Sequence, residues 1–235
     1  MSSPVVELAA VSKSYGGLRP LRIAGLSVDA GQRVAILGFD QPAAEVFVNL
    51  VTGATLPDEG EVRLFGRASS AIATGDDWLS TVDRFGIVSE RAVLLDRFTV
   101  VQNLALPFTV QIEPPPDAER ARAEAVAREV GLAEATFDAP LATLDPTAVM
   151  RVRLGRAIAF DPAVLLLEHA SARVPRDAVP GLAADIRAVA ERRRLAVIAV
   201  TADEAFAAGV ADRVFRLEAA TGRLAERGRG WFGRR

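Results

Sequence analysis

The chain has 235 residues and contains no cysteine, a single lysine (Lys13) and a single histidine (His169). The lack of cysteine excludes disulfides, thiolate metal sites and cysteine nucleophiles. Because lysine is almost absent, nearly every positive charge is an arginine. The 28 basic residues balance 30 acidic residues to a net charge of −2, which gives no electrostatic reason to expect nucleic acid as a partner.

Long apolar runs are also missing. None reaches the about 18 residues that a membrane-spanning helix needs. The first residues, MSSPVVELAAV, lack the charged start and apolar stretch of a secretory signal. Since 50% of the residues are hydrophobic, the chain can still bury a sizeable core in one α/β domain. We therefore expect a soluble, cytoplasmic protein.

Short strands dominate the first third of the sequence. Alternating apolar and polar residues predict half-buried strands over 5–15 and 21–28. A short apolar run at 33–37, ended by Gly38, is typical of a buried strand. Apolar residues at helical spacing then predict a helix over 43–52, and a turn leads into a strand at 61–64.

Helices and parallel strands are predicted further on. The three prolines at 114–116 cannot be helical, whereas the Ala-, Arg- and Glu-rich segment 117–130 favours helix. Asp145 as N-cap and Pro146 at the first helical position begin another helix. Apolar runs at 163–167 and 195–200, separated by a helical stretch at 177–192, indicate the βαβ rhythm of a parallel sheet.

The junction at Gly38 is where a phosphate-binding P-loop, G-x-x-x-x-G-K-[ST], would lie. In such a loop the lysine neutralises the phosphates and the hydroxyl holds Mg²⁺. Here residues 38–45 read GFDQPAAE, so only the first glycine remains. Ala44 stands at the lysine position and Glu45 at the hydroxyl position, and Pro42 removes a backbone donor. The main counter-charge for phosphate is therefore absent.

The segments that flank this junction resemble, in order and at family spacing, those of ABC-transporter ATP-binding subunits. The match runs from about residue 5 to 224. The segments are NLVTG at 49–53, PDEGEVRLFG at 57–66, GIVSE at 86–90, FTVVQNLALP at 98–107, LDPTAVMRVRLGRAIA at 144–159, DPAVLLLEHAS at 161–171, TADEA at 201–205 and ADRVFRL at 211–217.

The resemblance implies an α/β fold, a P-loop NTPase-like ABC cassette. Such a cassette has a mixed, mainly parallel core sheet, an N-terminal antiparallel β subdomain and a helical signature subdomain. A single cassette would cover 1–235. Its core and antiparallel subdomain would take about 1–90 and 160–225, and the Q-loop and helical subdomain about 91–159. The basic tail, 226–235, is expected to fray.

The same resemblance assigns site positions. Glu168 would replace the Walker B aspartate, and His169 would stand at the general-base position, as catalytic residues. No metal-ligand set is predicted. The positions that match the nucleotide site are Tyr15 (the aromatic that stacks on adenine), Gly38, Ala43, Ala44, Glu45, Val46 and Glu90 (the Q-loop glutamine).

Most of these positions depart from the family pattern. Ala202 stands at the switch histidine, Pro175 at the D-loop aspartate, and Asp145-Pro146 interrupt the signature. The resemblance implies ATP and Mg²⁺ as cofactors, but the missing anchors argue against both. Two residues have a simpler interpretation, which we favour: Glu45 as an acid near a helix dipole, and His169 as a structural or interface residue. For Tyr15, a role as a core or turn residue is an equal alternative to stacking on adenine.

The predicted function is a catalytically degenerate ATP-binding-cassette subunit of a membrane transport complex. It would dock to an integral membrane permease through residues 90–107, which keep Val93, Leu94, Leu95 and Phe98. It would pair as a homodimer or with another cassette, with no nucleic acid, on the inner face of the cell membrane.

Two alternatives remain open. One is an active ABC ATPase that uses Glu168, His169 and an arginine to power transport, with lipids as one cargo. The other is a soluble regulatory or scaffold pseudo-ATPase without a permease.

Overall fold

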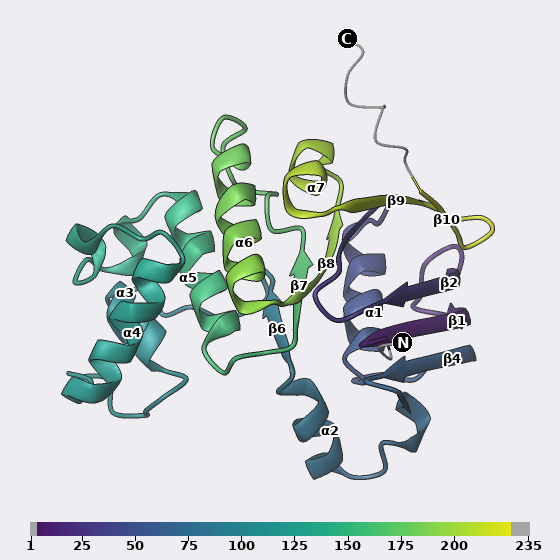
Figure 1. Ribbon diagram of the computed structural model, residues 1–235, viewed down its shortest axis with the longest axis horizontal. Helices are drawn as coiled ribbons and strands as arrows, with labels where there is room; N and C mark the ends of the chain where they lie inside the picture. The colour runs from purple at the N-terminus through teal and green to yellow at the C-terminus, as the bar shows by residue number, and fades with distance from the viewer. Residues whose placement is uncertain (1–3, 227–235) are drawn as a thin grey trace.

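The computed structural model of the chain describes residues 4–226 (Figure 1). The tail expected to fray therefore lies, except for Glu226, outside the described residues. The strands and helices are β1 Val6–Lys13, β2 Leu21–Val28, β3 Arg33–Leu37, α1 Gln41–Val51, β4 Glu59–Leu64, β5 Arg67–Ala68, α2 Gly75–Val82, β6 Phe85–Val88, α3 Val100–Ala105, α4 Asp117–Glu129, α5 Pro146–Ile158, β7 Val164–Glu168, α6 Val179–Arg193, β8 Ala196–Thr201, α7 Glu204–Val210, β9 Arg213–Glu218 and β10 Arg223–Glu226.

Two sheets organise the molecule. The first is antiparallel, with the order β2-β1-β4-β5. The second has the order β10-β9-β3-β8-β7-β6, and all its pairings are parallel except that of the edge strand β10. The predicted fold class, a mainly parallel core sheet with a separate antiparallel sheet, is confirmed.

Alternation along the parallel strands divides the core in two. In β7, Leu165 and Leu167 face one hydrophobic cluster, while Val164 and Leu166 face the other. Strands β3 and β8 alternate in the same way, because successive side chains of a strand point to opposite faces. Near-continuous apolar runs are therefore needed in these strands, since both faces of the sheet are covered.

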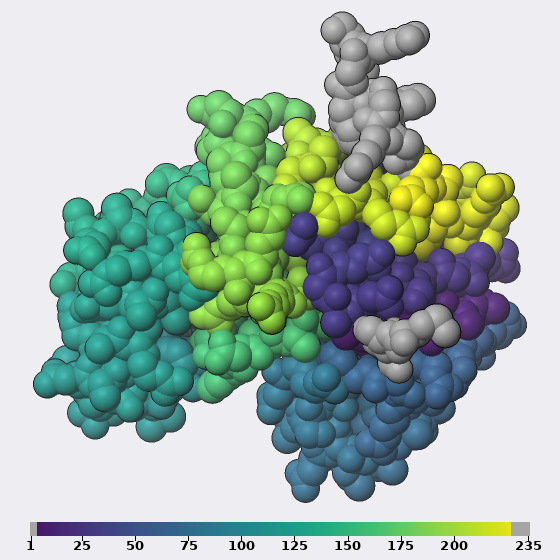
Figure 2. Space-filling model, in the orientation of Figure 1, coloured from purple at the N-terminus to yellow at the C-terminus, as the bar shows by residue number. Residues whose placement is uncertain are grey.

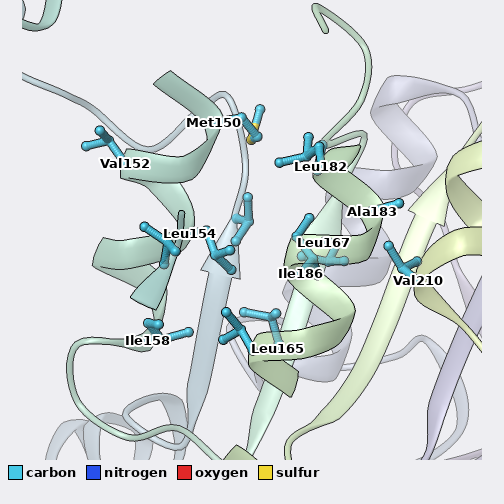
Figure 3. Close-up of a cluster of buried hydrophobic side chains, with 14 of the residues drawn as sticks. Met150, Val152, Leu154, Ile158, Leu165, Leu167, Leu182, Ala183, Ile186 and Val210 are labelled. Carbon is cyan, nitrogen blue, oxygen red and sulfur yellow. The ribbon is translucent and has the colours of Figure 1, made fainter. Parts of the chain in front are cut away.

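The first cluster joins the sheet to helices α3 to α7. Figure 3 shows Leu154 and Ile158 of α5 and Ile186 of α6 packed around Leu165 and Leu167 of β7. The second cluster holds α1 between the parallel and antiparallel sheets. In the space-filling view the helical part formed by α3, α4 and α5 (teal) lies on one side of α6, and the antiparallel sheet on the other (Figure 2).

The helix starts follow local sequence signals. Asp145 caps α5 as predicted, and its Oδ1 accepts hydrogen bonds from the backbone N–H groups of Thr147 and Ala148 at 2.8 and 3.0 Å. The predicted start of α1 at residue 43 is two residues late. The helix begins at Gln41, because Asp40 caps it and Pro42 fits its first turn. Within residues 4–226, no helix combines the length and apolar character needed to cross a bilayer.

Gly86 in β6 is required by close packing against the end of α5. A Cβ atom built there would lie 2.3 Å from the carbonyl oxygen of Ala157. Gly25 in β2 is its natural counterpart, because a Cβ there would have no atom within 4 Å. Substituting each glycine by alanine therefore distinguishes the effect of a backbone clash, at Gly86, from the effect of strand propensity alone, at Gly25.

We expect Gly86→Ala to lower the free energy of unfolding by roughly 2 kcal/mol, since backbone must move to admit the methyl group. Gly25→Ala should instead raise it by about 0.5 to 1 kcal/mol, because the methyl group meets no neighbour and glycine within a strand is destabilising relative to alanine. Urea unfolding followed by circular dichroism measures both. Equal effects of the two substitutions would contradict the close approach of β6 and α5.

Candidate functional site

The candidate site lies at the carboxyl edge of the parallel sheet, where α/β proteins bind their ligands. Gly38 follows β3, Glu168 ends β7, and Thr201 ends β8. Arg91 lies three residues beyond the end of β6. Parallel strands in register thus bring together groups that lie far apart in the sequence.

The turn from β3 into α1 is tight. Gly38 has φ +101°, and a Cβ atom there would lie 3.1 Å from the carbonyl oxygen of Leu217 in β9. Both facts favour glycine. The helix that follows is capped by its own chain: the Asp40 Oδ1 accepts a hydrogen bond from the Ala43 N–H at 2.9 Å. Pro42 has no N–H, and the Ala44 N–H already bonds to the Asp40 carbonyl.

Among residues 4–226, Glu168 is the one buried acidic residue, and its side chain is 0% exposed. Its Oε1 accepts a hydrogen bond from the Gln41 side-chain amide at 2.8 Å. Its Oε2 accepts from the Nη2 and Nε of Arg91 at 2.6 and 3.2 Å. The Nη1 of Arg91 lies 3.1 Å from a carboxylate oxygen of Glu45. One guanidinium therefore bridges two of the three acids that were predicted as site residues, Glu45 and Glu168.

The loop that carries Arg91 is tied to α5 by two arginines. Arg153 donates to the carbonyl oxygens of Ser89, at 2.9 Å, and of Ala92. Arg156 donates to the carbonyl of Val93 at 2.6 Å. Burial lowers the pKa of both guanidinium groups from the usual arginine value, and both stay charged.

Glu90, at the Q-loop position, pairs with a different arginine. Its Oε2 pairs with Arg173 at 2.7 Å. Its Oε1 is buried without a hydrogen-bond partner among the described residues. Glu90 thus lies in the same loop as Arg91 but takes no part in the bridge.

Tyr15, Gly38 and Ala43 share a cavity of about 150 Å³, which Asp40 and Arg22 also line. Burial, and secondarily the charge of Asp40, raises the pKa of the Tyr15 phenol above its usual value. The phenol is therefore protonated at neutral pH and can donate a hydrogen bond. Sequence resemblance thus predicted three residues that the fold does bring together.

His169 faces a different space. It lines a cavity of about 590 Å³ with Ala202, Thr201 and Arg176. Its backbone has φ +47°, and its N–H donates to the Val200 carbonyl. The Nε2 atom is buried and has no hydrogen-bond partner among the described residues. The two residues predicted as catalytic, Glu168 and His169, are consecutive in the sequence, but they lie in different environments. Glu168 contacts Gln41 and Arg91, whereas His169 lines the larger cavity.

The structure corrects our interpretation of Glu45. Glu45 lies beyond the first turn of α1, which contains no acidic residue, and a helix dipole acts mainly within that turn. Its carboxylate pairs with Arg91 instead. Ala44 is fully buried and Val46 is partly buried against the second core cluster, so both serve packing.

Three residues were missed in the sequence: Asp40, Gln41 and Arg91. The Asp40-x-Pro42 pattern is an N-cap signal that could have placed the helix start correctly. Gln41 and Arg91 gave no signal, because their partner Glu168 lies 127 and 77 residues away.

Sheet order, the separate antiparallel sheet and the glycine turn into α1 define the class: a P-loop-type α/β cassette. Residues 21–172 match the family model described as ABC transporter, and the chain belongs to that family.

Sequence relatives support this family membership, and a solved structure supports the fold. The methionine import ATP-binding protein MetN of Brucella abortus is 30% identical over 98% of this chain and 61% of its own length. The chain therefore spans about three-fifths of that relative. The lipoprotein-releasing system ATP-binding protein LolD of Saccharophagus degradans is 27% identical over 93% of this chain and 96% of its own. CbiO1 of Clostridium perfringens, part of an ABC transporter complex, has a TM-score of 0.77 at 19% identity over 95% of this chain and 88% of that one.

The capping role of Asp40 can be measured directly. We expect Asp40→Ala to lower the free energy of unfolding by about 1 kcal/mol, because the Ala43 N–H loses its acceptor. Asp40→Asn should stay within a few tenths of a kcal/mol, since asparagine caps equally well. Urea unfolding distinguishes them, and an equal loss in both variants would show that charge rather than capping matters.

Proposed function

We propose that this chain is an ATP-binding-cassette subunit of a membrane transport complex that docks to a permease without hydrolysing ATP at an ordinary rate. Membership of the ABC transporter family supports the transport role, as do the import and lipoprotein-release roles in the names of its relatives. The subunit would act in the cytoplasm, against the inner face of the cell membrane, paired with a second cassette.

The observation that carries the loss of hydrolysis is the N-terminus of α1. A phosphate site of this kind uses free backbone N–H groups at a helix start. Here the Asp40 carboxylate already accepts the Ala43 N–H, and Pro42 has none to offer. A phosphate oxygen brought about 4 Å from that carboxylate would meet a like-charge repulsion of several kcal/mol in a partly desolvated site.

The compensating charge is also missing. Ala44, at the lysine position, is fully buried, and the only lysine pairs with Asp58 at 2.8 Å. Residual ATP binding would rest on stacking against Tyr15, which contributes about 1 kcal/mol. ATP would therefore bind weakly, and its γ-phosphate would find neither anchor nor base.

Docking is supported by a groove of about 300 Å³ beside the loop after β6. Leu94, Phe160, Arg153 and Arg156 line it. Phe160 is 64% exposed, and nearby Val93 is 74% exposed. Apolar side chains between cationic ones suit an amphipathic helix laid across them. The groove lies between the loop at 89–93 and α5, at the border of the helical subdomain that we propose for about 91–159.

Calorimetric titration with ATP tests the nucleotide part of the proposal. We expect the same weak heat with Mg²⁺ and with EDTA, and phosphate release below about 0.01 s⁻¹, against 1–10³ s⁻¹ for typical enzymes. His169→Ala should change neither measurement. Micromolar, Mg²⁺-dependent binding followed by turnover that His169→Ala abolishes would establish the active ATPase instead.

Membrane recruitment tests the docking part. We expect the double substitution Val93→Asp and Phe160→Asp to reduce the membrane-bound fraction of the chain at least about tenfold in cells that express its transport complex, because the carboxylates would be desolvated against an apolar partner. Leu18→Asp is the matched control, since Leu18 is fully exposed and lies away from the groove. An unchanged membrane fraction in the double variant would favour a soluble scaffold without a permease.

A further inference from the structure

Glu168 poses a problem that the loss of hydrolysis does not explain. Its side chain is 0% exposed, and a buried carboxylate is costly unless a positive group compensates it. In a P-loop site, a cation does this: Mg²⁺ is held between a Ser or Thr hydroxyl and the acid that follows the central strand. The buried carboxylate of Glu168 therefore requires a positive group beside it.

The described residues do not fit Mg²⁺. The hydroxyl position is Glu45, and both oxygens of Glu168 already accept hydrogen bonds, Oε1 from Gln41 and Oε2 from Arg91. Mg²⁺ needs six oxygens in near-octahedral geometry. Residues 4–226 contain no group of three or more acidic or histidine side chains that could hold a metal ion.

Arg91 instead makes the contacts that a cation would make. Its Nη2 lies 2.6 Å from Glu168, and its Nη1 lies 3.1 Å from Glu45. The planar guanidinium fork can bind two carboxylates at once, which a lysine ammonium does less well. We propose that the Arg91 guanidinium is a built-in cation at the metal position, so that this site takes no divalent ion.

The loop geometry supports a permanent rather than a passing contact. The backbone N–H of Arg91 donates a hydrogen bond to the Ser89 Oγ at 3.1 Å. Arg153 holds the carbonyls on either side of it, at Ser89 and Ala92. The Arg91 side chain is 39% exposed, so solvent reaches one side of the guanidinium while the other faces the buried acid. The charge of Glu168 is thus compensated without any ion from solution.

The inference rests on the proposed function in that it concerns the same site of a degenerate cassette. Its test, however, uses the purified chain alone, with neither nucleotide nor permease. An unchanged membrane-bound fraction of the Val93→Asp and Phe160→Asp double variant would overturn the docking part of the proposed function and leave the built-in cation standing. Mg²⁺-dependent turnover of ATP would overturn both. Uptake of a divalent ion by the unaltered chain would overturn the built-in cation and leave docking standing.

Thermal unfolding of four proteins gives the first readout: the unaltered chain, R91M, E168Q and R91M/E168Q. We expect R91M to melt about 5 to 10 °C lower, because it leaves a buried carboxylate without its cation. In R91M/E168Q most of that loss should return, since no charge remains to compensate. A double variant that melts as low as the sum of the single effects, or that fails to fold, would overturn the proposal.

Mn²⁺ gives the second readout, because it binds oxygen ligands as Mg²⁺ does and is visible by electron paramagnetic resonance. Millimolar Mn²⁺ should raise the melting temperature of R91M by about 3 °C or more, with about one ion bound per chain. The unaltered chain and R91M/E168Q should move by less than about 1 °C. Equal Mn²⁺ binding by the unaltered chain, or none by R91M, would overturn the proposal.

R97M is the matched control. Arg97 belongs to the same connection between β6 and α3, and it is exposed. Its loss removes one positive charge without touching Glu168, so its melting temperature should stay within about 2 °C of the unaltered chain, and Mn²⁺ should not raise it. A response of R97M equal to that of R91M would mean that net charge, not the bridge, governs ion uptake.

Discussion

The buried charge of Glu168 is the constraint on which the arrangement at the sheet edge depends. A carboxylate at the end of β7 faces α1, because even-numbered residues of that strand point to the second core cluster. Its two oxygens must be satisfied there. Gln41 from the start of α1 and Arg91 from the loop after β6 do so. Three segments are thereby fixed to one another by a single acid.

The start of α1 at Gln41, two residues before the predicted start, is related to the contacts of Glu168. Beginning at Gln41 brings its amide against Glu168, and it makes Asp40 the N-cap. One acid thus caps the helix, and one proline lies within its first turn.

Three arginines stabilise the loop after β6 and its contact with the sheet edge. Arg153 and Arg156 hold backbone carbonyls of the loop after β6, and Arg91 compensates buried charge. The guanidinium suits these roles, because it carries five donors in a rigid plane and keeps its charge when partly buried. The helical part is consequently tied to the core sheet by polar bonds as well as by the shared hydrophobic cluster.

The sequence by itself determined the elements and their class. Apolar runs placed β3, β7 and β8, Asp145 placed the start of α5, and the ordered flanking segments indicated the ABC cassette. These signals are local, since strand burial, helix capping and turn glycines depend on residues a few positions apart. The junction at Gly38, where only one glycine of the pattern is present, was recognised from the flanking segments, which resemble the family in order and spacing.

Only the tertiary structure decided which partners the predicted site residues contact. Glu45 was expected to interact with a helix dipole, but it meets Arg91 because the sheet brings the end of β6 beside the end of β7. Tyr15 does join Gly38 in one cavity, whereas His169 turns toward another. The pairing of Arg91 with Glu168 spans 77 residues. Neither hydrophobic periodicity nor a helix-capping pattern in the sequence predicts such a contact. Its physical cause is the register of parallel strands, which exists only once the sheet has formed.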